Sequence, residues 1–125
     1  MAYVFFNNNP MRKNTGDCVV RAISIITGMS WDDTVDELVD VVHDIGELIS
    51  DNTTWGEYLR RVGYKRHVIP DTCPMCYTVR DFCEDHPRGV YVLATGTHVV
   101  AVVDGNYIDA WDSGAEQPIY YWRKE

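Results

Sequence analysis

The 125-residue chain contains no apolar run of 18 residues, so no segment has the length expected of a membrane-spanning helix. The short apolar stretch at residues 3–6 is not preceded by basic residues and gives way to asparagines, so a secretory signal is not predicted either. Basic side chains are few, with 11 Lys and Arg against 19 Asp and Glu, and they are scattered along the chain. A net charge of -8 without a basic patch disfavours binding to phosphate backbones. We therefore expect a cytoplasmic protein that binds neither membranes nor nucleic acids.

Internal repeats and low-complexity segments are also absent, and a chain of this length leaves little room for a second domain. A hydrophobic content of 46% is enough to build one core. Without a secretory signal, the four cysteines are expected to be free thiols or metal ligands in a reducing compartment, not two disulfides. The prediction is a single domain over residues 1–125.

Apolar periodicity predicts helices in the first two thirds of the chain. The run that starts at Asp17 is apolar on nearly every side apart from Arg21 and Ser24, which is typical of a buried helix. The run that follows is amphipathic, and we expect it to pack on one side only. The predicted helices are 17–27, ended by Gly28; 30–45, capped by Ser30 and ended by Gly46; 55–62, capped by Thr53 or Thr54 and ended by Gly63; and 79–85, capped by Thr78.

The last third of the chain has the composition of β-strands. β-Branched and aromatic runs alternate there with turn residues, and residues 1–16 are expected to form a short strand or arm followed by a loop. Strands are predicted at 64–69, 89–94, 98–103, 106–111 and 118–122. We expect an antiparallel sheet of about four strands in the C-terminal third, with short turns between successive strands. Helices followed by such a meander indicate an α+β fold.

Cys18 is the candidate nucleophile. It follows the turn residue Gly16 and stands where the first buried helix is predicted to begin. At that position the helix dipole and the unpaired backbone N–H groups favour the thiolate, which is the nucleophilic form of cysteine. The alternative is that Cys18 is a small buried hydrophobic residue of the core.

His98 is the candidate base. A cysteine nucleophile needs a base that takes its proton and a third group that orients the base. Among the four histidines, His98 alone opens a predicted strand, after the turn at 96–97, where a side chain can project over a neighbouring helix end. The other three histidines lie within a helix, directly after two basic residues, or before a proline.

The orienting carboxylate follows from the register of the next hairpin. A two-residue type I′ turn at 104–105 pairs Val103 with Asn106 and places Asp109 diagonally across from the histidine. A three-residue loop would instead place Asp112 opposite the histidine, because a one-residue slip moves every side chain to the other face. The Asp-Gly sequence of the turn favours Asp109.

These residues resemble the papain-like cysteine peptidase superfamily. Asp-Cys at the start of a buried helix, His-Val-Val-Ala-Val-Val from 98 to 103, and Asp109 on the next strand are similar to motifs of small bacterial and phage-borne members and of bacteriocin-leader peptidases. Those motifs are Asp-Cys-Gly, His-hydrophobic-Val-Val and Asp-Pro, and the resemblance covers residues 14–28 and 95–114. It implies a papain-like fold with the nucleophile helix packed on the sheet. It also implies that Cys18 attacks, His98 acts as general base and then acid, and Asp109 orients the imidazole.

Three positions depart from the family pattern. Family members often carry an oxyanion-stabilising Gln a few residues before the cysteine, where this chain has Arg12. The nearest amide is Asn14, which is the candidate oxyanion donor beside the Cys18 backbone N–H. Val19 replaces a glycine and Ala110 replaces a proline, so narrower clearance is expected beside the nucleophile.

A second group of residues has the composition of a metal site. Cys73, Cys76, Cys83 and His86 form a C-x2-C and a C-x2-H pair within 14 residues, as a structural zinc knuckle could use. The alternatives are that Cys83 faces the core and that His86 bonds the last carbonyl groups of its helix.

Two classes of function follow from these residues. The leading hypothesis is a hydrolase that cleaves amide bonds of a peptide or protein substrate through a thioester acyl-enzyme and requires no cofactor. The same trio would serve a peptidase, a deamidase, a transglutaminase-like enzyme or an isopeptidase. The alternative is a papain-like module that binds a partner without catalysis, with or without the zinc knuckle.

Overall fold

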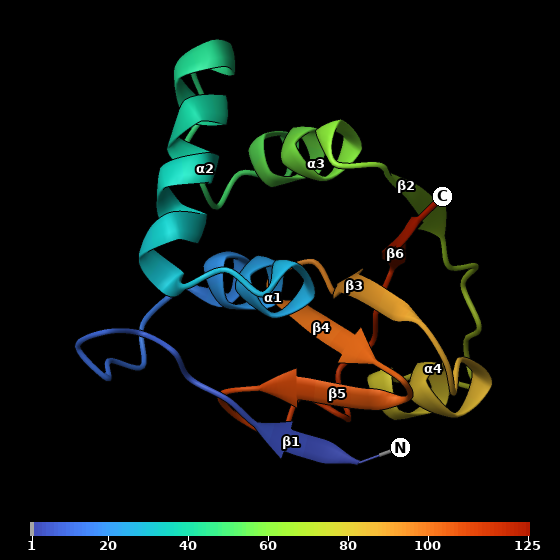
Figure 1. Ribbon diagram of the computed structural model, residues 1–125. Coiled ribbons are helices and arrows are strands. Elements are labelled where there is room, and N and C mark those ends of the chain that lie inside the picture. Colours follow the sequence, from blue (N-terminus) through green and yellow to red (C-terminus); the bar gives the residue numbers. More distant parts are fainter. Residues whose placement is uncertain (1) are drawn as a thin grey trace.

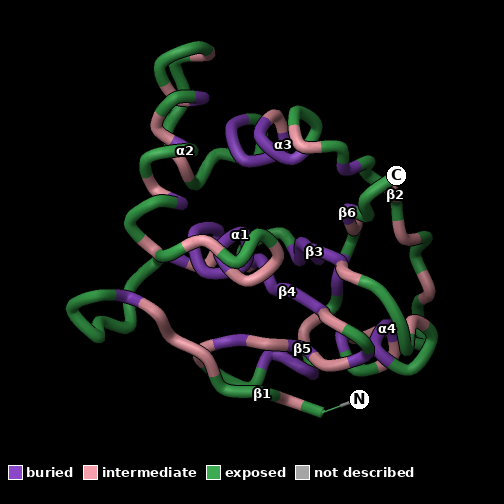
Figure 2. The backbone as a smooth tube through the Cα atoms, viewed as in Figure 1, coloured by how far each residue is buried: buried purple, intermediate pink, exposed green. Residues whose placement is uncertain are grey.

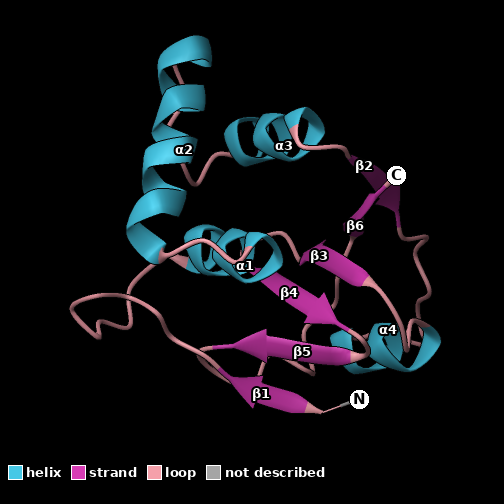
Figure 3. Cartoon of the chain, viewed as in Figure 1, coloured by secondary structure: helices cyan, strands magenta, loops and turns pink. Residues whose placement is uncertain are grey.

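The computed structural model, which describes residues 2–125, has the expected α+β architecture (Figures 1 and 3). Over these residues, the elements in chain order are β1 (Tyr3–Phe5), α1 (Cys18–Thr27), α2 (Trp31–Ile45), α3 (Asn52–Arg61), β2 (Tyr64–Val68), α4 (Val79–Asp85), β3 (Val90–Ala94), β4 (Val99–Val103), β5 (Asn106–Asp109) and β6 (Tyr120–Lys124). The strands form one six-stranded sheet in the order β1-β5-β4-β3-β6-β2. α1, α3 and α4 contact strands of this sheet, whereas α2 packs on α1 and α3. Within residues 2–125, none of the helices combines the length and the apolar character that crossing a membrane requires.

The sheet is larger and less regular than the sequence predicts. β3, β4 and β5 form the expected antiparallel meander. β6 begins two residues later than predicted and returns across the sheet to pair with β3. Two edge strands complete the sheet, because β1 runs parallel to β5 and β2 pairs with β6. The four C-terminal strands are therefore antiparallel, as predicted, but β1 and β2 extend the sheet and β6 does not follow β5 through a short turn. A local alternation pattern says nothing about pairing between distant segments.

The start of α3 also differs from the prediction. Asp51 is its N-cap, and the carboxylate accepts the backbone N–H of Thr53 at 2.9 Å. Thr54, an expected cap, is buried instead, and its hydroxyl donates to the Glu47 carbonyl oxygen at 2.9 Å. Asp is among the strongest N-cap residues, so the helix begins at Asn52, three residues earlier than predicted.

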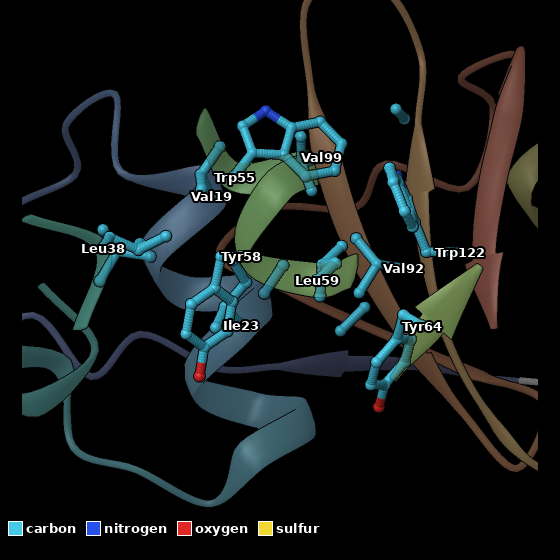
Figure 4. Close-up of a cluster of buried hydrophobic side chains, with 14 of the residues drawn as sticks. Val19, Ile23, Leu38, Trp55, Tyr58, Leu59, Tyr64, Val92, Val99 and Trp122 are labelled. Carbon is cyan, nitrogen blue, oxygen red and sulfur yellow. The ribbon is translucent and has the colours of Figure 1, made fainter. Parts of the chain in front are cut away.

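The two faces of the sheet carry separate cores. Alternate residues of a strand point to opposite faces. Val92 and Val99 accordingly belong to the core beneath α1, α2 and α3, and Leu93 and Val100 to the core beneath α4. Figure 4 shows the first core, in which Trp55 of α3 packs with residues of the sheet. α1 contacts three strands and α2, which explains why its sequence is apolar on nearly all sides and why residues 19–24 of this helix are buried (Figure 2).

The hairpin between β4 and β5 has the predicted turn. Asp104 and Gly105 have φ angles of 49° and 77°, as a type I′ turn requires at both central positions. Val103 therefore lies opposite Asn106, which confirms the predicted register. This register brings Asp109, at the end of β5, beside the start of β4.

Replacing Gly105 by Ala should lower the free energy of unfolding by about 1 kcal/mol, because an L side chain is strained at positive φ. Urea denaturation followed by fluorescence measures the change. Gly16→Ala is the matched control, since that residue is not left-handed and an added Cβ meets no atom within 4 Å. Equal stability of the two variants would contradict the assigned turn.

Candidate active site

Cys18 is the first residue of α1, and its side chain is partly buried at the N-terminal end of that helix. It lines a cavity of about 210 Å³ that also reaches His98, the residue directly before β4. The other lining side chains carry no charge at neutral pH, and they include Asn52, Trp55 and Tyr120. The structure therefore brings the candidate nucleophile and the candidate base to one cleft whose other side chains are uncharged.

A short hydrogen bond joins His98 to Asp109. The distance from His98 Nε2 to Asp109 Oδ2 is 2.6 Å, and the two side chains are only 10% and 1% exposed. The Ser113 hydroxyl donates to the same carboxylate oxygen at 2.7 Å. Burial by itself would raise the pKa of Asp109, but the bonds from His98 and Ser113 outweigh it and lower that pKa. Asp109 is therefore an ionised acceptor that fixes the imidazole. The indole of Trp111 packs against this imidazole, with ring centroids 4.7 Å apart.

The bond to Asp109 also assigns the two imidazole nitrogens of His98. A carboxylate only accepts, so Nε2 carries the proton that it receives. Nδ1 is then the ring nitrogen left for the Cys18 thiol, whose pKa is lowered by its interaction with His98. This division of roles is the one a base needs when a third group holds its tautomer.

Both partners of the Cys18–His98 pair are shifted toward their charged forms. Burial acts to raise the pKa of Cys18, but hydrogen bonds with His98 and the Val99 backbone, and the charges of His98 and Arg21, outweigh it, so the pKa is lowered. Burial likewise acts to lower the pKa of His98, but the bonds with Asp109 and Cys18 prevail and raise it to about 9. The two groups titrate as a pair, and the arrangement favours thiolate and imidazolium together.

Two residues of the site, Arg21 and Ser113, were not assigned a role from the sequence. Arg21, one turn after the cysteine, is 4% exposed, and its guanidinium bonds both Asp17 at 2.9 Å and Asp109 at 3.0 Å. The signal was present in the sequence as an arginine inside a helix predicted to be buried, four residues after an aspartate. Ser113 left no such signal, because it lies in the loop beyond β5.

Asp112, the alternative third residue, lies outside the Cys18–His98–Asp109 cluster. Its carboxylate accepts the Tyr107 hydroxyl at 2.7 Å and pairs with Arg80 at 3.3 Å. The predicted preference for Asp109 as the partner of His98 therefore agrees with the geometry, and it follows from the two-residue turn.

The candidate oxyanion donor Asn14 is exposed and is not among the residues that line the cleft. The side-chain amide that does line it is Asn52, the first residue of α3. The Asn52 side-chain oxygen accepts the Trp55 indole N–H at 3.1 Å, which orients the amide.

The four proposed zinc ligands are not gathered into one site. Cys73 and Cys76 are exposed in the loop before α4, whereas Cys83 is fully buried in the core beneath that helix. The His86 ring nitrogen Nδ1 lies 2.9 Å from the Phe82 carbonyl oxygen, as the alternative reading of that residue expects. Among residues 2–125, no group of three His, Cys, Asp or Glu side chains is placed to hold a metal ion.

Comparisons with protein-family models, with curated proteins and with solved structures found no match for this chain. Function is therefore inferred from the site geometry and from the resemblance of its motifs.

Cys18 should be alkylated by iodoacetamide at about neutral pH before any other cysteine. Although Cys73 is exposed, a bond to Asp71 and the neighbouring Cys76 raise its pKa, and burial raises the pKa of Cys83 to about 11. Quenched time points analysed by peptide mass mapping give the order of labelling. Faster labelling of Cys73 or Cys76 than of Cys18 would contradict the lowered pKa.

Replacing His98 by Ala should slow that alkylation at least about tenfold at neutral pH, because the thiol loses the bond that lowers its pKa while it keeps the burial that raises it. The rate should recover as the pH rises past the ordinary thiol value of 9.0. His67→Ala, on β2, is the control and should leave the whole pH profile unchanged.

Proposed function

We propose that the protein is a papain-like cysteine hydrolase that cleaves amide bonds of a peptide or protein substrate. The observation that carries the proposal is the 2.6 Å bond between His98 and a buried Asp109, in the same site as a cysteine at the start of a helix. Each partner supplies what a thiol nucleophile needs: a base within reach, a group that holds the base, and a helix end that favours the thiolate.

Acylation begins from the thiolate–imidazolium pair. The Cys18 sulfur attacks the carbonyl carbon of the scissile amide, and the carbonyl electrons move onto the oxygen. The first N–H groups of a helix have no intrahelical partner, so the Cys18 N–H is available to stabilise that oxyanion. The C–N bond then breaks while His98 gives its Nδ1 proton to the leaving nitrogen, and a thioester forms.

Deacylation reverses the role of His98. The neutral imidazole takes a proton from water through Nδ1 as the water oxygen attacks the thioester carbonyl carbon. The C–S bond breaks, the carboxylic acid leaves, and the thiolate is restored beside the imidazolium. Asp109 stays ionised throughout and holds Nε2–H. Peptidases, deamidases and isopeptidases differ in the amine released in the first half, and transglutaminase-like enzymes in the acceptor that replaces water.

Substitutions in the proposed site should show that Asp109, and not Asp112, orients His98. With a mixed peptide library as substrate, Cys18→Ala should abolish turnover, and Asp109→Asn should reduce it by about 100-fold or more because the imidazole loses its orienting charge. Asp112→Asn is the matched control and should retain most activity. Mass spectrometry of new N-termini together with released ammonia distinguishes peptide cleavage from deamidation. Activity that survives Cys18→Ala would refute the proposal.

Replacing each candidate asparagine in turn should identify the side chain that stabilises the oxyanion. We expect Asn52→Ala to reduce turnover about tenfold or more, because its side chain lines the cleft and its amide is oriented by Trp55. Asn14→Ala, from the exposed segment before α1, should have a smaller effect on turnover. A larger loss for Asn14→Ala would instead favour Asn14, the amide nearest to the position at which the family pattern has a glutamine.

A further inference from the structure

A buried chain of three charged groups lies behind His98. The Arg21 guanidinium contacts Asp17 through one terminal nitrogen and Asp109 through the other, with N–O distances of 2.9 and 3.0 Å. The side chains of Asp17, Arg21 and Asp109 are 6%, 4% and 1% exposed. Burying three charges is costly unless each is paired and hydrogen-bonded, so such an arrangement calls for a reason beyond packing.

The bonds of Asp109 leave its carboxylate no freedom to rotate. Oδ1 accepts from Arg21 and from the Ala110 backbone N–H at 2.8 Å, and Oδ2 accepts from His98 and Ser113. Arg21 thus occupies the oxygen that His98 does not use. The guanidinium fork fixes which oxygen faces the imidazole and at what angle.

Asp17, the charged group farthest from His98, is held just as firmly as Asp109. The second Asp17 oxygen, Oδ2, accepts the Trp31 indole N–H at 2.9 Å and the Asn9 amide at 3.3 Å. Asp17 does not use its side chain to cap α1, although it stands at the N-cap position. Its carboxylate is instead committed to Arg21 and to two donors from neighbouring segments.

Charge balance explains why a second carboxylate is needed. Arg21 alone would neutralise Asp109 and weaken the attraction that keeps His98 protonated. Asp17 offsets the charge of Arg21, so the three groups together present one negative charge to the imidazole. Arg21 provides orientation, and Asp17 removes its electrostatic penalty.

We propose that Asp17 and Arg21 are positioning residues that act through Asp109, with Arg21 fixing the carboxylate and Asp17 restoring the net negative charge behind His98. This inference rests on the proposed function, because it assigns the two residues a role in preparing the thiolate–imidazolium pair. The other titratable or charged groups near these three charges are Cys18 on α1, Tyr3 on β1 and the separate Asp112–Arg80 pair. The Tyr3 hydroxyl donates to the Asp109 carbonyl oxygen at 3.2 Å.

The test follows the titration of the His98 ring by NMR, through its Cε1–H resonance, identified by its loss in His98→Ala. Asp17→Asn should move the midpoint to lower pH by roughly one unit, because Arg21 then neutralises Asp109. Arg21→Gln should move it to higher pH, because two carboxylates then face one imidazolium. The double variant, with both amides, restores the balance and should return the midpoint to about the wild-type value.

Conservative replacement separates charge from geometry. Arg21→Lys keeps the positive charge but lacks the fork that bonds both carboxylates, so the His98 midpoint should stay near wild type while Cys18 alkylation slows. Should Asp17→Asn fail to fold, wild type, Arg21→Gln and the double variant still form the comparison, since the double variant leaves no unpaired buried arginine. Midpoints that do not move in the single variants, or move in the same direction, would overturn the proposal.

The titration of His98 and the alkylation of Cys18 distinguish failure of this inference from failure of the proposed function. Unmoved midpoints in a protein whose Cys18 is still alkylated first would overturn the role of Asp17 and Arg21 and leave the hydrolase proposal in place. Opposite shifts in a protein whose Cys18 is inert would support the charge chain and overturn the hydrolase proposal.

Discussion

The ion pair between Arg21 and Asp109 is the contact on which the geometry of the site depends. It joins α1, which carries Cys18, to β5, which carries the carboxylate, across 88 residues of sequence. Apolar packing is enough to place a buried helix on a sheet, but it tolerates small shifts of the helix along its axis. A buried charge pair does not, because a shift would leave charges desolvated and unpaired. Packing therefore brings helix and sheet together, and the ion pair sets their alignment.

The parts of the site that follow from the sequence are those encoded by neighbouring residues. The turn residue Gly16 and the apolar run that follows it were enough to predict that Cys18 lies at the start of a helix. The Asp104-Gly105 turn was enough to prefer Asp109 over Asp112, because a two-residue turn dictates strand register. In each case the deciding interaction lies within a few residues of the predicted feature.

The parts that could not be predicted depend on contacts between distant segments. The pairing of β1 with β5 joins residues more than 100 positions apart, and a three-residue apolar run does not specify a partner. The place of Cys83 in the core was missed for a related reason, since the spacing of possible ligands does not say which face of a short helix turns toward the core. Arg21 is an intermediate case. The sequence shows a charged residue in a helix that is predicted to be buried, but it does not show that Arg21 binds both Asp17 and Asp109.

The pairing of β1 with β5 has a consequence for when the site can exist. The Phe6 N–H donates to the Asp109 carbonyl oxygen at 2.8 Å, and β6 closes the other side of the meander. During synthesis the thiol-bearing helix leaves the ribosome long before the segments that supply its base and carboxylate. A nascent chain would thus carry a cysteine without its base or its orienting carboxylate, and the reactive pair would be assembled only once the C-terminal strands have been made. The proposed site would therefore depend on contacts between residues far apart in the sequence, which form late in folding.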